Sequence, residues 1–174
     1  MNGRLIIDNV LMAFEMMHQI NLKKTWAKGE MALKLDMSKA YDKVEWACLD
    51  KIMEKLWFHS RWRSLMMQCI SSVTYAICIN GKPSGHIILT RGLRQGDLLS
   101  PYLFLLCVKG LSALIKKAIA DGLLEGISMC KGGPCLSHLF FADDSLIFCK
   151  ATIEECEAPY RRYCARMSKL LTNS

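Results

Sequence analysis

Three aspartates are the residues of this 174-residue chain whose type and placement best suggest chemistry. Asp143 and Asp144 are adjacent and stand between two apolar runs, and Asp36 ends a third apolar run. Adjacent carboxylates in a place of low dielectric repel one another unless cations or hydrogen-bond donors neutralise them. An aspartate pair is also common in a solvent-exposed turn, and either feature taken alone favours that plainer interpretation.

The three carboxylates taken together indicate a functional site more strongly than either feature alone. A strand-end aspartate and a hairpin-tip pair on adjacent strands would converge on one place in the fold. Such a set matches a two-metal site, in which ions about 3.5 to 4 Å apart stabilise the attacking and leaving oxygens of a displacement at phosphorus. The predicted reaction class is phosphoryl transfer. Between the acids in sequence, residues 91–97 (RGLRQGD) offer glycines for close backbone approach and arginines for phosphate. A surface loop with incidental charges explains that segment equally well.

Apolar periodicity predicts the elements that would position these residues. Residues 31–36 alternate as a short strand, and the apolar runs 138–141 and 146–148 predict a hairpin with residues 142–145 at its tip. Ser100 and Pro101 predict the start of a helix that ends near Gly122. These elements predict an α+β fold in which helices pack on one face of an antiparallel sheet.

Three further elements are predicted from spacing and turn chemistry. An opening helix over residues 5–20 buries a stripe made of Ile6, Val10, Phe14 and Met17. A second hairpin has strands at residues 75–80 and 87–90, joined by a turn over residues 81–85. Ser38 is expected to cap a helical segment that contains Leu49 and Met53.

Charge and cysteine content narrow the class of protein. The net charge is +7 with a pI near 9.0, which suits a polyanionic partner and equally a merely basic protein. The nine cysteines include no C-x-x-C pair and are odd in number, which indicates reduced thiols in an intracellular protein. No apolar stretch has transmembrane length and no signal peptide begins the chain, so a soluble protein without membrane contact is expected.

Four segments in order resemble reverse transcriptases, specifically those of plant non-LTR (LINE-type) retrotransposons. Residues 35–46 (LDMSKAYDKVEW) are similar to the first catalytic motif of that family, and residues 91–104 (RGLRQGDLLSPYLF) to its second. Residues 140–144 (FFADD) are similar to the third motif, and residues 3–9 (GRLIIDN) to the segment leading into the palm. Three long motifs in the correct order make accident a poor explanation.

The resemblance implies a polymerase centre made by the three aspartates. Asp36, Asp143 and Asp144 would hold two Mg²⁺ ions, with Mn²⁺ able to substitute and the carbonyl of Met37 as an additional ligand. The reaction would be attack of a primer 3′-hydroxyl on the α-phosphate of a dNTP, with an RNA template and a DNA primer.

The same resemblance implies residues that bind the nucleotide. Tyr41 matches the aromatic ring that lies under the sugar and excludes a 2′-hydroxyl. Gln95 and Gly96 match the loop that packs against the incoming nucleotide and the template base, and Ala142 matches the position beside the primer end.

The implied architecture is a single, truncated reverse transcriptase domain over residues 1–174. Residues 31–42 and 91–150 would form a polymerase-type catalytic palm, and about 43–90 a fingers and palm insertion, with incomplete fingers and no thumb. The missing fingers and thumb segments would belong to a longer polyprotein, so the isolated chain is expected to fold marginally and extend primers poorly. The resemblance also implies an intracellular, nuclear location.

Other interpretations stay open at the level of sequence. Leu98 stands where the family more often has proline, and Pro159 falls inside a last helix that the capping box of Thr152 and Glu155 predicts. Both features favour a decayed, catalytically inactive retroelement relic with residual nucleic-acid binding. A group II intron maturase or an RNA-dependent RNA polymerase would share the fold. A structural protein whose acids are solvated turns would share only the acidic residues.

Overall fold

The computed structural model describes residues 6–22, 29–36, 39–128, 133, 135–141, 144–153 and 155. The chain divides into two compact units, which are described separately. Unit 1 comprises residues 1–38 and 111–172, and unit 2 comprises residues 39–110 with 173–174, so the division falls within helix α4 (Ser100–Ala120). The single-domain interpretation stays a prediction. No helix among the described residues is long and apolar enough to cross a membrane.

Unit 1 contains the strands that the sequence predicts around the acidic residues. Its main sheet is antiparallel and runs in the order β1 (Glu30–Asp36), β7 (Asp144–Lys150), β6 (His138–Phe141). A second, short pair consists of β4 (Ile127–Ser128) and β5 (Cys135–Leu136). The predicted strand before Asp36 and the predicted hairpin before and after the acid pair are both confirmed. The mixture of helices with antiparallel sheets also confirms the α+β class.

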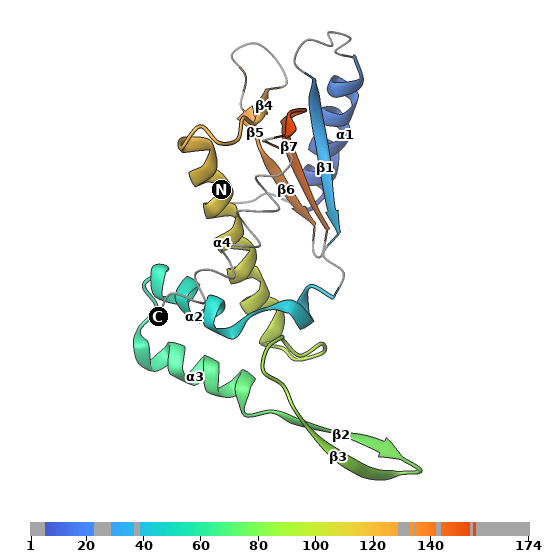
Figure 1. Cartoon of the computed structure of the whole chain (residues 1–174), viewed down its shortest axis with the longest axis vertical. Helices are drawn as coiled ribbons and strands as arrows, with labels where there is room; N and C mark the ends of the chain where they lie inside the picture. Colours follow the sequence, from blue (N-terminus) through green and yellow to red (C-terminus); the bar gives the residue numbers. More distant parts are fainter. Residues whose placement is uncertain are drawn as a thin grey trace. The chain divides into compact units, whose positions relative to one another are not determined.

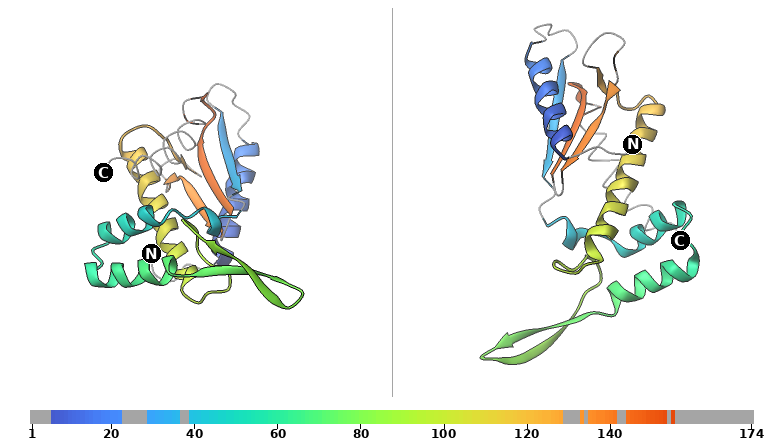
Figure 2. Two further views of the ribbon diagram at one scale, coloured as in Figure 1. Left: turned by 60° about the horizontal axis from the view of Figure 1, so that its bottom comes forward. Right: turned by 180° about the vertical axis from the view of Figure 1, so that it is seen from behind.

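Helices cover both faces of the main sheet, which corrects the prediction of helices on one face. Ile147 and Cys149 pack with Ile115 of α4 on one side. Phe148, between them in sequence, packs with Met16 of α1 (Ile6–Leu22) on the other side. Figure 1 and the view from behind in Figure 2 show α1 and the C-terminal part of α4 on opposite sides of the sheet. The continuous apolar run of β7 is the reason, because a strand buried on both faces needs cover on both.

The buried stripe of α1 also differs from the prediction. Phe14, predicted to be buried, is 76% exposed, whereas Met16 is 0% exposed and packs on the sheet. Val10 and Met17 are exposed as well, and the side chain of Ile6 lies outside the described residues. This helix is apolar on several sides, so two different stripes have helical spacing. The spacing alone does not show which stripe packs on the sheet.

Unit 2 begins with helices that pack closely on one another. Its elements are η2 (Tyr41–Lys43), α2 (Trp46–Lys55), α3 (Ser60–Ser71), β2 (Thr74–Ile79), β3 (Lys82–Ile88) and the first part of α4. A Cβ placed on Gly110 of α4 would meet Ile52 of α2 at 2.8 Å, so these two helices approach at a residue without a side chain. Arg63 of α3 donates two hydrogen bonds of 2.9 Å to the carboxylate of Asp50 in α2.

The predicted cap of the second helix is wrong. Helix α2 begins at Trp46 and its N-cap residue is Glu45, whose side chain makes no capping hydrogen bond. The segment before it is the short 3₁₀ helix η2, and Ser38 lies outside the described residues.

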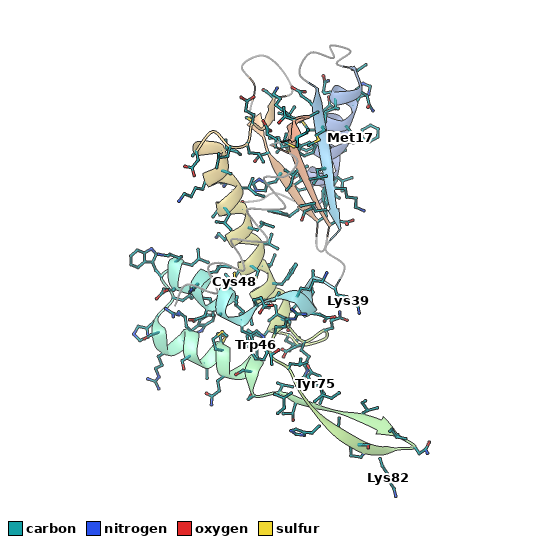
Figure 3. The ribbon with its side chains drawn as sticks, viewed as in Figure 1. Met17, Lys39, Trp46, Cys48, Tyr75 and Lys82 are labelled. Carbon is teal, nitrogen blue, oxygen red and sulfur yellow. The ribbon has the colours of Figure 1, made fainter. Side chains whose placement is uncertain are left out.

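The hairpin of unit 2 has a tighter turn than the sequence predicted. The turn is Asn80-Gly81, with φ of 50° and 77°, as in a type I′ turn. Residues 82–85, predicted to be the turn, instead begin β3, where Gly85 at φ 77° makes a bulge opposite β2. Almost every residue of this two-stranded ribbon is exposed, and Lys82 points away from its tip (Figure 3).

Two helices end in the same capping motif but with different residues at the critical position. After α4, Leu123 N–H donates to Ala118 and Gly122 N–H to Ile119, with Gly122 at φ 68°. After α2, Phe58 N–H donates to Met53 and Trp57 N–H to Glu54, with Trp57 at φ 64°. Both are Schellman motifs, whose left-handed residue is usually glycine because a Cβ is strained there. Trp57 is moreover 94% exposed, so its indole gains little packing in return.

We expect the Trp57→Gly substitution to stabilise the protein by about 1 kcal/mol, the typical cost of a left-handed conformation for a residue with a side chain. Urea unfolding of the two proteins measures the difference. Gly122→Ala is the matched control and is expected to destabilise, because it introduces a Cβ at the equivalent position of α4. A Trp57→Gly protein that is less stable than the original chain would contradict the assignment of this strain.

Candidate active site

Two of the three aspartates are backbone partners on adjacent strands of the main sheet of unit 1. Asp36 ends β1 and Asp144 begins β7, and their Cα atoms are partners in the antiparallel register. Directly opposed residues of this kind have Cα atoms about 4.5 to 5.5 Å apart, and like charges there are destabilising unless something neutralises them. The backbone register therefore brings two acidic residues together, and a shared cation would relieve repulsion between their carboxylates.

The register also moves Asp144 from the predicted turn into a strand. Phe141 of β6 is the cross-strand partner of Asp144, so only Ala142 and Asp143 separate the two strands. Ala142, Asp143 and Met37, all predicted site residues, lie outside the described residues, and so does the side chain of Asp36. Among the residues that the structure does describe, no group of three or more His, Cys, Asp or Glu side chains could hold a metal ion.

Asp144 already binds a cationic side chain. The ammonium Nζ of Lys34, two residues before Asp36 on β1, lies 3.1 Å from Oδ2 of Asp144. The side chain of Asp144 is 41% exposed, so solvent ions also reach it. The solvent-exposed carboxylate of Asp144 thus binds a cation in this structure. Carboxylate oxygens are also the ligands that divalent ions such as Mg²⁺ prefer. Lys34 was not predicted to belong to the site, although its alternation with Asp36 along the strand was a usable signal.

The burial of Ser145 indicates the face of the sheet on which Asp144 lies. Ser145 is buried, and successive strand residues point to opposite faces, so Asp144 is directed away from the face that α4 covers. The Ser145 hydroxyl has no hydrogen-bond partner among the described residues. A buried hydroxyl without a partner costs free energy.

In unit 2, Tyr41 is held by a stacked aromatic pair. Its ring lies on that of Phe104 in α4, with centroids 4.6 Å apart and the ring planes 15° from parallel. Phe104 is itself buried, so Tyr41 is supported from one side by a fixed surface. Sequence reasoning included Phe104 in the second motif but gave it no role.

Backbone hydrogen bonds tie the loop of residues 91–99 to the segment that carries Tyr41. Leu93 N–H donates to the carbonyl of Tyr41 and Gly92 N–H to that of Val44, both at 2.8 Å. Gly92 has φ 94°, and a Cβ there would lie 3.1 Å from the carbonyl oxygen of Asp42. No other residue fits this position without strain. The indole of Trp46 donates to the carbonyl of Gly92 at 2.7 Å and completes the attachment.

The two predicted nucleotide residues of this loop remain accessible. Gln95 and Gly96 are exposed, and Gly96 has φ 84° with no atom within 4 Å of a Cβ position. Asp97 accepts a hydrogen bond from Leu99 N–H at 2.9 Å just before α4 begins. The loop is thus anchored at Gly92 and Asp97, and the residues between them are open to a ligand.

Comparison with known proteins decides the family. The family of reverse transcriptases (RNA-dependent DNA polymerase) matches residues 4–172. The chain belongs to this reverse transcriptase family. Reverse transcriptases use divalent metal ions, in agreement with the acidic pair of Asp36 and Asp144. The predicted resemblance is therefore confirmed.

Three relatives are similar to this reverse transcriptase domain, and two of them are proteins of mobile elements. It is 47% identical over 78 residues to an uncharacterized mitochondrial protein of Arabidopsis thaliana, covering 41% of the chain and 64% of that protein. It is 28% identical over 133 residues to a retrovirus-related Pol polyprotein from type-1 retrotransposable element R2 of Popillia japonica, covering 75% and 20% respectively. It is 24% identical over 163 residues to a transposon TX1 uncharacterized 149 kDa protein of Xenopus laevis, covering 91% and 12%. The chain thus spans less than two thirds of each of these relatives.

Proposed function

We propose that this chain carries the catalytic centre of an RNA-directed DNA polymerase of a non-LTR retrotransposon. The observation that carries the proposal is the pairing of Asp36 with Asp144 at the ends of two antiparallel strands in a member of the reverse transcriptase family. The substrates would be a dNTP, an RNA template and a DNA primer. Fingers and thumb segments of a longer polyprotein would supply further grip on the nucleic acid.

The acidic residues would act as metal ligands. Asp36, Asp143 and Asp144 would hold two Mg²⁺ ions, with the Met37 carbonyl as a further ligand and Mn²⁺ as a substitute. Oxygen donors of this kind suit Mg²⁺, which would lower the cost of charge developing on the attacking and leaving oxygens. Lys34 would have to release Asp144 before a metal ion binds, since the ammonium lies against one of its carboxylate oxygens.

Residues of the second and third motifs would orient the nucleotide. Gln95 and Gly96, which are open to a ligand, would contact the dNTP and the template base, and Ala142 would lie beside the primer end. Tyr41, supported by Phe104, would lie under the sugar and exclude a 2′-hydroxyl. A ring fixed on one side cannot move away from an added hydroxyl at low cost, which would produce a preference for deoxynucleotides.

We expect Tyr41→Ala to reduce the preference for dNTP over NTP by roughly 10- to 100-fold, since removing an overlap of about 1 to 3 kcal/mol has this effect on a rate ratio. The measurement is kcat/KM for one dNTP and the matching NTP on the same primer and template. Tyr41→Phe keeps the ring and its stacking on Phe104, so it should keep the preference. An unchanged ratio in Tyr41→Ala would remove Tyr41 from this role.

The proposed function is tested with the purified 174-residue chain, a DNA primer annealed to an RNA template, one dNTP and Mg²⁺. We expect slow addition of single nucleotides to the primer, with dNTP preferred over NTP. Nucleic-acid binding without any addition, in Mg²⁺ and in Mn²⁺, would instead support the inactive relic. Equal use of NTP and dNTP would favour an RNA polymerase.

The nuclear location implied by the resemblance stays a prediction. Microscopy of the tagged chain in plant cells tests it directly.

A further inference from the structure

His138 of β6 is held from both sides of its ring. Its Nε2 lies 2.8 Å from the hydroxyl of Ser112 and its Nδ1 lies 2.9 Å from that of Ser137. The ring also contacts Phe140 at a centroid distance of 4.9 Å. Both ring nitrogens therefore have partners and the orientation of the ring is fixed.

The bond to Ser112 joins two elements that are distant in sequence. Ser112 belongs to the part of α4 that covers one face of the sheet, 26 residues before His138. The hydrophobic cluster between this part of α4 and the sheet provides apolar contacts, as between Ile115 and Ile147. Apolar packing is non-directional, so it opposes separation of helix and sheet more than it opposes sliding. The half-buried hydrogen bond between Ser112 and His138 is directional and therefore opposes sliding as well.

The imidazole is neutral under ordinary conditions. Burial, with a smaller contribution from the charge of Lys116, lowers the pKa of His138 to about 4. A neutral ring offers one donor and one acceptor, and serine hydroxyls complement either arrangement. In an unfolded chain the pKa of histidine is about 6.5, so the unfolded state gains protons first as the pH falls. Stability is therefore lost progressively between about pH 6.5 and pH 4.

The position of His138 connects this bond to the acidic residues. His138 pairs with Ile147 and Phe141 pairs with Asp144 on the same two strands. A shift of β6 along α4 would therefore move the end of the hairpin that carries Asp144. Misplacement of a reacting group by about 1 Å can cost on the order of 100-fold in rate.

We propose that His138 is a positioning residue, which through its bond to Ser112 fixes the β6–β7 hairpin against α4 and so sets the geometry of the acidic pair. Neither His138 nor Ser112 contacts metal or substrate in this role. The bond to Ser137 orients the ring, and the bond to Ser112 transmits the constraint. The effect on the acidic pair rests on the proposed polymerase function. The link between β6 and α4 is independent of that function.

Four variants separate the two bonds. Ser112→Ala removes only the link to α4, and Ser137→Ala removes only the neighbouring hydroxyl. His138→Gln can place an amide near the position of Nε2, whereas His138→Asn reaches only the position of Nδ1. We expect Ser112→Ala and His138→Asn to behave alike, and His138→Gln to retain most of the original behaviour.

The first readout is affinity for Mn²⁺ alone, measured by electron paramagnetic resonance on the full chain without denaturant. Ser112→Ala and His138→Asn should bind Mn²⁺ about tenfold more weakly, the size of effect seen when supporting partners of a metal site are removed. Ser137→Ala and His138→Gln should change it by less than about threefold. A purely structural role would lower stability but leave the affinity of the folded protein unchanged. Equal affinities in Ser112→Ala and the original chain would overturn the proposal.

The second readout is backbone hydrogen exchange, which does not depend on metal binding. Ser112→Ala should raise exchange at residues 139–141 and 144–146 without a matching rise at residues 31–33 of β1. A uniform rise, or none, would overturn the positioning role even if Mn²⁺ binds. Local exchange that rises as expected in a chain that binds no Mn²⁺ would instead contradict the polymerase proposal and leave the link between β6 and α4 supported.

Discussion

Asp144→Asn is expected to lower the rate of nucleotidyl transfer by about 10³-fold or more. Loss of one carboxylate ligand removes several kcal/mol of metal-based stabilisation of the transition state, and about 4 kcal/mol corresponds to a factor of 10³. Asn keeps the size of the side chain, so the register with Asp36 should persist. Single-turnover addition of one dNTP to a primer measures the rate. Mn²⁺ affinity, which needs no primer, should fall in parallel.

Loss of folding would not explain such a result. The ion pair between Lys34 and Asp144 is largely exposed, and exposed pairs contribute about 0 to 1 kcal/mol to stability. Asp121→Asn is the matched control, because Asp121 is an exposed aspartate of the same unit that no site includes. The control should keep its rate and its Mn²⁺ affinity. Asp144→Asn with an undiminished rate would remove the acidic pair from the mechanism.

Phe148→Ala is expected to destabilise unit 1 by about 3 to 5 kcal/mol, the usual cost of removing a buried aromatic side chain. Phe148 is 0% exposed, lies in the central strand β7 and packs in the cluster that contains Met16 of α1. Its loss would leave a cavity between the sheet and that helix. Urea unfolding followed by far-ultraviolet circular dichroism measures the change.

Phe14→Ala is the matched control for this experiment, since it removes the same side chain from an exposed position of α1. Exposed substitutions usually change stability by less than about 0.5 kcal/mol. A large cost at Phe14 would mean that the stripe predicted from sequence is buried after all. Equal costs at Phe14 and Phe148 would contradict the packing of α1 described above.

The sequence was sufficient where local signals agree with one another. Strand β1 and α4 each have an apolar pattern of a single period, and the β6–β7 hairpin consists of two apolar runs on either side of a turn. These elements also have a clear start or end, such as Gly122 after α4. It was insufficient where one pattern fits two packings. The apolar faces of α1 are the example, because only the sheet decides which face is buried.

Turn chemistry was misread for a related reason. Residues 81–85 contain two glycines and a proline, which indicate a turn, but Asn80-Gly81 alone provides one. Gly85 makes a bulge within the strand, a role that sequence alone does not distinguish from a turn.

For the site, the sequence identified the acidic residues but not their surroundings. That Asp36 lies opposite Asp144 follows from expecting adjacent strands, and the structure agrees. The alternation along β1 puts Lys34 on the same face as Asp36, but its ion pair with Asp144 and the stacking of Tyr41 on Phe104 join residues that are distant in sequence. The roles of all the predicted site residues stay predictions, and Met37, Ala142 and Asp143 also lie outside the described part of the chain.

The exposed ribbon of β2 and β3 has a consequence for the behaviour of the protein at high concentration. Among the described residues each strand pairs only with the other, so both outer edges present unpaired backbone groups. Ile77, Ile79, Ile87 and Ile88 are exposed on it. Free strand edges bearing β-branched apolar residues recruit further strands and promote aggregation, and Lys82 and Pro83 oppose this at only one end. Self-association through this ribbon is thus the expected route by which the purified chain precipitates, and charged substitutions at Ile77 and Ile88 are the direct remedy.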